Sequence, residues 1–470
     1  MSSIYKRYFE IVPNNNIDNF TPDDGVDIIN FIIPPVQGAI LPTTDLVMTG
    51  NLQVFTNHTV GAEARYLTGD TSRVSIDNIA GIHGCISRVD ITSRQGNVLM
   101  EQRQNYSLVS KWKRGVMSNE DFRVGRYNVQ QLSSSTAMGS RGFLMSATTA
   151  RDGTPFTVQL NTGILMDNVQ QINLPASGGI ELKIHLESTN QFLMNLDNSM
   201  VAGSKLTTDW SYRLTNVKLF GRYNYVQPAL LNSLSGISFK AITNNMNTIQ
   251  SSRDTMSFSP QVNSLDKILY IYQPNEDTRN NSTTNGLSTN QLIGLNNYAV
   301  SNNGVKFPYD YDITINPSLQ NNATAVVGEG LSLNTVADDA YRQVGDAEVL
   351  YHWIVGMNGS YPPVHSMVNG RNYENSLADI YGSYATVAAQ PNPRTNLWGN
   401  NIQGVGTSYQ YGFEGYSTPM PNNLVQLETT SQVKTSDAVV PAVIRNQVQT
   451  ENAFIVYNAQ LSYAGMNVAK

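Results

Sequence analysis

The chain has 470 residues and a net charge of -6, from 30 basic and 36 acidic side chains. This acidic balance excludes a globally basic nucleic-acid-binding protein and is compatible only with local basic patches. Only 14% of the residues are charged, against about 25% in an average domain, and asparagine, serine and threonine take their place. Because these residues favour turns, caps and exposed strand faces, the composition predicts strands joined by many loops, with few long helices.

Strand-type patterns fill the first half of the chain. Strands are predicted at 27–33, 46–55, 73–77, 85–92, 98–100, 156–160, 180–186 and 214–220. The clearest, 180–186, alternates apolar and polar residues with the period of a half-buried strand. A helix is predicted at 106–114, where Leu108, Val109 and Trp112 follow a helical spacing and Gly115 is a candidate C-cap.

The second half has longer polar stretches. Residues 227–255 predict a connector with one strand near 237–242, and residues 273–303 predict a long exposed loop. Further strands are predicted at 267–272, 424–428 and 453–463. Helices are predicted at 338–354 and 374–381, the second within a loop-dominated region at 359–422.

The single cysteine and the lack of long apolar runs limit the setting of the protein. Cys85 alone excludes a disulfide framework within the chain and a cysteine-based zinc site, so a reducing compartment is expected. The first ten residues contain no apolar core of a signal peptide, and no stretch reaches the ~20 apolar residues of a membrane span. We therefore expect a protein that is not secreted and has no transmembrane segment.

Two pairs of segments repeat at a constant offset. Residues 184–189 are similar to 425–430, an offset of 241 (425 minus 184), and 215–226 are similar to 457–468, with Asn216 matching Asn458 at an offset of 242 (458 minus 216). The conserved order and spacing favour an internal duplication; the alternative is two unrelated sandwich domains with generic strand patterns.

Both alternatives predict an all-β protein with two consecutive β-sandwiches. About eight short strands per half, separated by long loops, suit two jelly rolls with a few short helices in the loops. We predict an N-terminal arm at 1–26, a first jelly roll at 27–226 and a second jelly roll at 227–470.

Three stretches resemble the double jelly-roll major capsid proteins of double-stranded DNA viruses, of the polinton-like virus and virophage type. In the first, residues 81–101 form a strand, a turn and a second strand that ends at Glu101, followed by Asn105-Tyr106 at a helix start. The second comprises 172–175 with 178–184, and the third is 263–270. The resemblance spans most of the chain, and its motifs are patterns rather than catalytic residues.

The resemblance implies a homotrimer with a pseudo-hexagonal outline. Two rolls in each of three subunits would give six similar rolls, which tile an icosahedral shell around a double-stranded DNA genome. It also implies neighbouring trimers, penton proteins and minor or cement capsid proteins as partners. The protein would then be found in the virion, after assembly in the host cytoplasm or nucleus.

The residues indicate no catalytic, cofactor or metal site. The five histidines lack metal-ligand spacing, and the glycine pairs at 328–330 and 404–406 lack the context of a phosphate-binding loop. His83-Gly-Cys85 is better explained by a small buried residue entering a strand than by a thiol active site. His185 is expected to be a hydrogen-bonded sheet residue.

Basic side chains give two candidate contacts with packaged DNA. The denser cluster contains Lys111, Lys113 and Arg114, with Arg103, Arg123 and Arg126 nearby. If it faced a shell interior it could bind phosphates without sequence preference; the favoured alternative is basic residues near a helix C-terminus, where they suit the helix dipole. Lys6 and Arg7, in a short mobile arm, form the second candidate, for contact with the genome, neighbours or internal proteins.

Three classes of function stay open. We expect a major capsid subunit that is not an enzyme and takes no cofactor or small-molecule substrate. The alternatives are a jelly-roll carbohydrate-binding or host-attachment protein, with an aromatic loop at 409–416, and a minor or penton capsid component. A β-sandwich glycoside hydrolase would require a close pair of carboxylates in a cleft.

Overall fold

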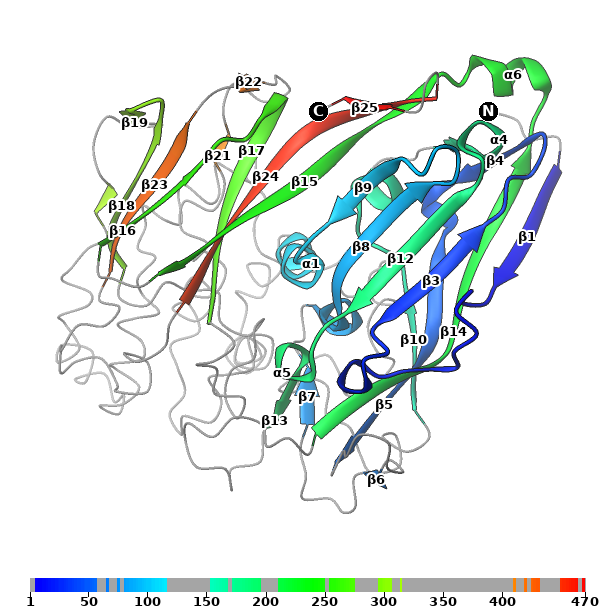
Figure 1. The fold of residues 1–470 in the computed structure, drawn as a ribbon, viewed down its shortest axis with the longest axis horizontal. Helices are drawn as coiled ribbons and strands as arrows, with labels where there is room; N and C mark the ends of the chain where they lie inside the picture. Colours follow the sequence, from blue (N-terminus) through cyan, green and yellow to red (C-terminus); the bar gives the residue numbers. More distant parts are fainter. Residues whose placement is uncertain are drawn as a thin grey trace, which may run out of the picture.

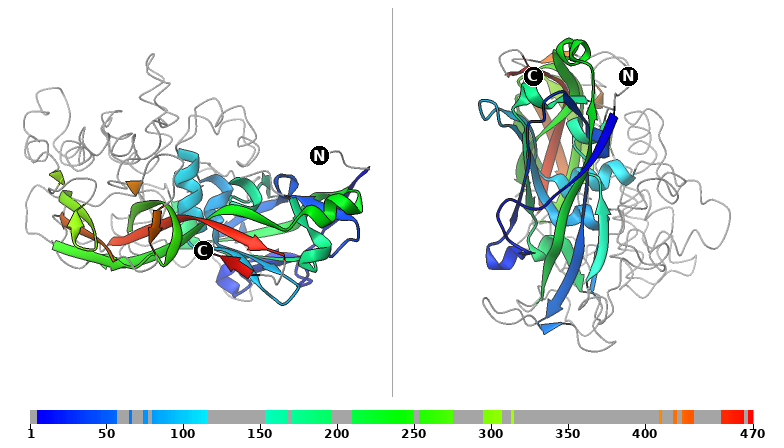
Figure 2. Two further views of the ribbon diagram at one scale, coloured as in Figure 1. Left: turned by 90° about the horizontal axis from the view of Figure 1, so that it is seen from above. Right: turned by 90° about the vertical axis from the view of Figure 1, so that its right-hand side faces the viewer.

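The computed structural model describes about half of the chain. The described residues are 5–56, 65–66, 74–76, 80–115, 153–167, 171–195, 210–249, 253–274, 295–306, 313–314, 409–410, 418–420, 424–431, 449–463 and 467–469. They form antiparallel sheets with a few short helices, arranged as two rolls side by side along the longest axis (Figures 1 and 2). The expected all-β class with two consecutive jelly rolls is confirmed.

The first roll is a sandwich of two main sheets. One sheet has the order β10 (Thr154–Val158), β5 (Val47–Thr56), β14 (Trp210–Tyr225), β4 (Ala39–Pro42) and β11 (Gln171–Asn173); β1 (Tyr5–Ile11) and β2 (Asn19–Phe20) also pair with β14, and β6 (Arg65–Tyr66) pairs with β5. The other has the order β3 (Ile28–Ile33), β12 (Ile180–Leu186), β8 (Ile86–Ser93) and β9 (Leu99–Arg103). A small sheet pairs β7 (Val74–Ile76) with β13 (Leu193–Asn195).

Short helices connect these strands. They are η1 (Pro22–Asp24), η2 (Thr43–Asp45), η3 (Gly81–Cys85), α1 (Tyr106–Gly115), η5 (Gly163–Asp167), α4 (Leu174–Ser177), α5 (Thr189–Phe192) and α6 (Pro228–Ser233). The predicted helix at 106–114 is α1. The helix α6 follows β14 and leads into the second roll (Figure 1).

The second roll repeats this arrangement. Its first sheet has the order β15 (Gly236–Ile249), β24 (Gln449–Ser462), β17 (Val262–Pro274) and β21 (Tyr409–Gln410); β22 (Thr418–Met420) also pairs with β17, and β25 (Asn467–Ala469) pairs with β24. Its second sheet has the order β16 (Arg253–Phe258), β23 (Val425–Ser431), β18 (Leu295–Asn302) and β19 (Val305–Lys306), and β20 (Ile313–Thr314) pairs with β18.

The sheet order places the repeated segments in equivalent positions. The pair at offset 241 begins in β12 and β23. In the first roll β12 is the second strand of its sheet, between β3 and β8, and in the second roll β23 is likewise second, between β16 and β18. The pair at offset 242 begins in β14 and β24, and each of these strands pairs with the first strand of its roll (β1 or β15) and with a later one (β5 or β17). This agreement supports duplication over two unrelated sandwiches.

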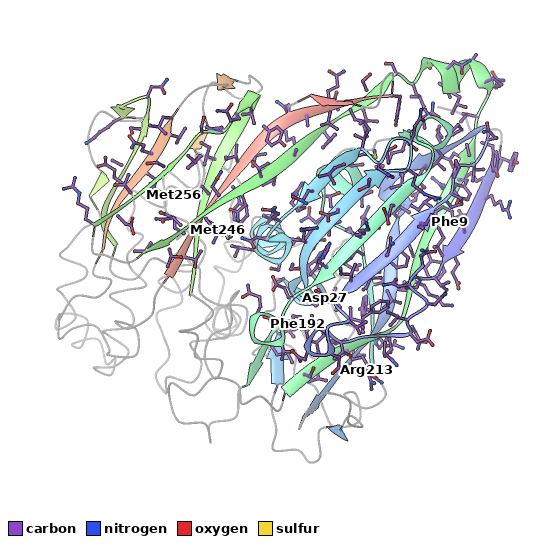
Figure 3. The ribbon with its side chains drawn as sticks, in the orientation of Figure 1. Phe9, Asp27, Phe192, Arg213, Met246 and Met256 are labelled. Carbon is purple, nitrogen blue, oxygen red and sulfur yellow. The ribbon has the colours of Figure 1, made fainter. Side chains whose placement is uncertain are left out.

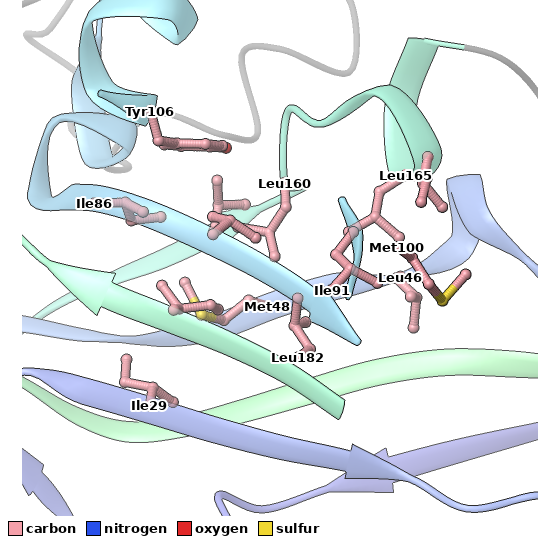
Figure 4. Close-up of a cluster of buried hydrophobic side chains, with 14 of the residues drawn as sticks. Ile29, Leu46, Met48, Ile86, Ile91, Met100, Tyr106, Leu160, Leu165 and Leu182 are labelled. Atoms are coloured by element: carbon pink, nitrogen blue, oxygen red, sulfur yellow. The ribbon is translucent and has the colours of Figure 1, made fainter. Parts of the chain in front are cut away.

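The core of the first roll lies between its two main sheets. In β12 every second residue is buried, as its alternating sequence requires. Figure 4 shows Ile29, Ile91 and Leu182 from one sheet and Met48 from the other within one apolar layer. All four side chains are almost fully excluded from solvent, which is the main stabilising contribution in such a sandwich.

Residues 5–11, within the segment 1–26 expected as an N-terminal arm, form the strand β1, which pairs with β14. The ring of Tyr5 stacks on Tyr225 at 4.1 Å, and Phe9 stacks on Tyr223 at 4.3 Å. Phe9 also covers Gly221, where a Cβ would lie 2.4 Å from its ring. Aromatic contacts between neighbouring strands therefore hold β1 in the sheet.

Two further expectations for the second half need correction. Residues 295–302 form β18, so the predicted loop at 273–303 is wrong over that stretch. The strand predicted near 237–242 extends over Gly236–Ile249, because all fourteen residues find partners in β24. The predicted helices at 338–354 and 374–381 lie outside the described residues.

Candidate functional site

The part of the chain that carries the family resemblance, β9 and the start of α1, forms the junction between the two rolls. Figure 1 shows β9 and α1 on the side of the first roll that faces β15 and β24. We define the junction by β9, α1 and η5 of the first roll and by β15 and β24 of the second. Its contacts are an ion pair, an asparagine cluster and an apolar cluster.

A buried ion pair lies at the centre of the junction. Glu101 and Arg103 are two residues apart on β9 and therefore point to the same face. An Nη2–Oε1 distance of 2.7 Å joins them, with side chains 1% and 0% exposed. The Glu101 carboxylate also accepts hydrogen bonds from the backbone N–H groups of Gly163 at 2.7 Å and Ile164 at 2.8 Å. These charge-assisted bonds offset the cost of burying the carboxylate.

The same residues touch the second roll. Arg103 Nη2 lies 3.5 Å from the backbone oxygen of Lys240 on β15, and a Cβ on Gly163 would lie 2.1 Å from that oxygen. Only glycine allows the backbone of η5 to approach β15 this closely. Glu101 therefore holds η5 against β9 at the place where η5 contacts β15 of the second roll.

Three asparagines form a second contact across the junction. The fully buried Asn452 on β24 accepts hydrogen bonds at its Oδ1 from Nδ2 of Asn105 at 2.9 Å and from Nδ2 of Asn244 at 3.2 Å. Asn105 directly precedes α1, whereas Asn244 lies on β15. A buried amide needs such partners, so this cluster fixes how the two rolls are aligned.

Helix α1 provides an apolar contact. Leu108 and Val109 on α1, with Ala80, form one buried cluster with Ile242, Phe454 and Val456 of the second roll. The residues from Glu451 to Tyr457 are all buried, although neighbouring residues in a strand point to opposite faces. Both faces of β24 are therefore covered over this stretch, and α1 helps to cover one of them.

Tyr106, the other residue of the Asn-Tyr motif, joins segments of the first roll. Its hydroxyl accepts a hydrogen bond from the backbone N–H of Asn161 at 2.7 Å and lies 2.8 Å from Nδ1 of the buried His83. The histidine is therefore a hydrogen-bonded core residue. His185 lies on β12 with its Nε2 3.3 Å from Oδ2 of Asp90, in agreement with the expected sheet residue.

A cavity of about 510 Å³ lies beside the ion pair, lined by β9, β15 and β24. Its wall includes Leu99, Met100, Phe239 and Tyr457 together with Glu101. Burial raises the pKa of Tyr457, and the negative charge of Glu101 adds to the rise while Arg103 opposes it. Among the described lining residues Glu101 is the one carboxylate, and both its oxygens are engaged, so the wall offers no acid–base pair.

Cys85 is a buried core residue. Burial is the main cause that raises the pKa of its thiol, so the reactive thiolate is disfavoured. Within the described part of the chain, no group of three or more histidine, cysteine, aspartate or glutamate side chains could hold a metal ion. Across the same residues, no helix has the length and apolar character needed to cross a membrane.

We expect Cys85 to remain unreactive towards a thiol reagent in native buffer. Addition of denaturant should release one reactive thiol per chain, because the sequence contains a single cysteine. Absorbance of a released chromogenic thiolate measures both states. A native protein that reacts as fast as free cysteine would contradict the buried position.

The two predicted basic clusters belong to different elements of the first roll. Lys111, Lys113 and Arg114 belong to the last turns of α1, and their side chains lie outside the described residues, as do Arg123 and Arg126. Arg103 is buried against Glu101, so its assignment to a DNA-contacting cluster is wrong. Lys6 and Arg7 are exposed on β1, on the side of the first roll away from α1 (Figure 1).

Comparison with known proteins finds matches in structure but not in sequence. No protein-family model and no curated protein matches the sequence. The Faustovirus major capsid protein matches in structure with a TM-score of 0.50 and 9% identity, covering 98% of this chain and 91% of that one. VP54 of PBCV-1, as fitted into a reconstruction of the virophage Sputnik, matches with a TM-score of 0.50 and 10% identity, covering 100% and 98%.

The mavirus major capsid protein has a TM-score of 0.48 and 11% identity, covering 98% of this chain and 89% of that one. The first two matches, over nearly the whole length of both chains, define the fold. The chain has the double jelly-roll fold of viral major capsid proteins, and the resemblance expected from residues 81–106 is confirmed at the level of the fold.

Proposed function

We propose that the protein is a major capsid protein, a structural subunit and not an enzyme. Three copies form a pseudo-hexagonal capsomer, and these capsomers tile an icosahedral shell around a double-stranded DNA genome. The observation that carries the proposal is the pair of rolls with equivalent sheet orders, joined by a buried junction. Three such subunits present six similar rolls, and repetition of similar edges is what a closed shell requires.

The proposal includes the division of the chain into an arm at 1–26, a first roll at 27–226 and a second at 227–470. The strands from β1 to β14 pair only with one another among the described residues, and so do those from β15 to β25. The helix α6 lies at the proposed boundary. These observations support a break near residue 227, and the strand β1, within the proposed arm, pairs with β14 of the first roll.

The proposed partners are other copies of the chain, penton proteins and minor or cement capsid proteins. Packaged DNA would be contacted without sequence preference by Lys111, Lys113, Arg114, Lys6 and Arg7. The virion is the proposed location, with assembly in the host cytoplasm or nucleus. The exposed position of Lys6 and Arg7 supports their share of this role.

Sedimentation of the purified protein tests the oligomeric state. We expect a trimer whose interfaces bury well above ~2,000 Å² in total, as obligate interfaces do. Its thermal midpoint should rise with protein concentration until the trimer is saturated. Electron microscopy of assembled material should show a hexagonal lattice of trimers, whereas a stable monomer at high concentration would contradict the proposal.

A further inference from the structure

The outer edge of β1 has no strand partner among the residues that the structure describes. Among the described residues, β1 pairs with β14 alone, in a continuous register from Tyr5 to Ile11 without a bulge. It contains no proline, and Figure 3 shows Phe9 on the rim of the first roll far from the second roll. Exposed, regular strand edges of this kind readily pair with another chain.

The outward face of β1 and of the residue that follows it carries apolar side chains. Tyr8 is 75% exposed and Val12 is 60% exposed. Both lie on the face opposite to Tyr5 and Phe9, which pack on β14. Lys6 and Glu10 lie on the same outward face, one on each side of Tyr8, so the face is charged at both ends and aromatic in the middle.

The sequence of β1 is complementary to itself in one register. When two copies of a strand pair antiparallel about a twofold axis, the axis passes between the two copies of one residue, because backbone N–H and C=O groups alternate in direction along each strand. That residue then faces its own copy, and the residues on either side of it face each other in order. An axis at Tyr8 pairs all seven residues and places Lys6 opposite the second copy's Glu10, twice. An axis at Arg7 would place like charges opposite each other, and one at Phe9 would separate Lys6 from Glu10.

We propose that β1 is a contact between two copies of this chain, formed by antiparallel pairing of their β1 strands about a twofold axis at Tyr8. The contact joins neighbouring capsomers. Only this placement between capsomers rests on the proposed function, whereas the pairing of the two strands does not. Glu10 already lies 2.7 Å from Lys218 of its own chain, with both side chains more than 40% exposed. A carboxylate has two oxygens, so Glu10 can also accept from Lys6 of the second copy.

The contact is weak for an isolated pair of molecules. A seven-residue strand pair buries far less than the ~1,600 Å² of a standard interface. Many such contacts act together once copies are held in one assembly, because each then forms at a high effective concentration. Weak pairwise binding also allows misplaced capsomers to dissociate before a shell closes.

Thiol cross-linking of the full chain tests the register. Directly opposite residues have Cβ atoms about 4.5–5.5 Å apart, whereas Lys6 and the second copy's Lys6 would be about 13 Å apart along the strands. Tyr8→Cys protein at high concentration should therefore form covalent dimers with a short bifunctional maleimide. Neither Lys6→Cys nor Glu10→Cys alone should do so, but a mixture of the two should. Wild-type protein is the control, since Cys85 is buried.

Charge exchange provides a second measurement. Glu10→Lys should weaken self-association between capsomers roughly tenfold, because it places like charges opposite each other at two positions. The double variant K6E/E10K restores opposite charges across the axis but not the pair with Lys218, so recovered association would report the contact between copies. Sedimentation of the three proteins measures the difference.

The outcomes separate this contact from the proposed function. If trimers form but Tyr8→Cys cross-links no faster than Lys6→Cys, the β1 contact is wrong and the capsid proposal stands. If Tyr8→Cys cross-links but no trimer is found, the pairing of β1 stands and the trimeric capsomer is wrong. Equal association of wild type, E10K and K6E/E10K would also overturn the proposed register.

Discussion

Replacing Glu101 by glutamine is expected to lower the free energy of unfolding by about 3–5 kcal/mol, because Arg103 then keeps a buried charge without a carboxylate partner. The variant also replaces one of the two carboxylate oxygens, which accept from the N–H groups of Gly163 and Ile164, by an NH2 group that cannot accept a hydrogen bond. Since this site adjoins β15, the two rolls should also unfold less cooperatively. Denaturant titration followed by tryptophan fluorescence and by circular dichroism measures both effects.

Two controls separate the buried charge from the loss of side-chain contacts. The double variant E101L/R103M removes both charges and should recover most of the lost stability, because an apolar pair of similar volume needs no compensation. Lys183→Met breaks a partly exposed ion pair with Glu181, at 3.3 Å, and should change stability by less than about 1 kcal/mol. If E101Q were no worse than Lys183→Met, the ion pair would not stabilise the junction.

Replacing Phe454 by alanine should cost about 3–5 kcal/mol, the range for a large aromatic side chain removed from a packed interior. Phe454 is fully buried, and it belongs to the cluster in which Leu108 and Val109 of α1 meet the second roll. The loss of stability should therefore extend to α1, although the substitution lies in β24. Amide hydrogen exchange of residues 106–110 measures this effect directly.

The conservative variant Phe454→Leu is the matched control. It retains an apolar side chain of intermediate volume and should cost markedly less than Phe454→Ala. Exchange rates in α1 should follow the same order. If α1 exchanged at the wild-type rate in Phe454→Ala, the helix would not depend on the second roll for its stability.

Strands with one buried face could be predicted from the sequence. The alternation at 180–186 predicted β12 with its observed bounds, because every second side chain enters a continuous core. β1 was missed, since its aromatic residues do not alternate and its stability depends on partners in β14. β18 was missed because its sequence is rich in asparagine and its neighbour β23 supplies the pairing.

One side of the junction could be predicted from the sequence, and its partners could not. The motif from Glu101 to Tyr106 marked the segment, and a continued strand would have placed Glu101 and Arg103 on one face, which argues against a free basic residue. Their partners could not be predicted, because Gly163, Lys240 and Asn452 are far away in the chain. Contacts between segments so distant leave no local pattern of residues.

The pairing of first and last strands has a consequence for synthesis. β1 pairs with β14, and β15 pairs with β24, so each roll can close only after its final long strand has left the ribosome. Domains made first generally fold first, and such distant pairings form slowly. The first roll therefore completes while β24 is still absent, and Leu108 and Val109 of α1 stay open to water until Phe454 arrives. During that interval the nascent chain exposes an apolar face, and we expect it to need a chaperone at this stage.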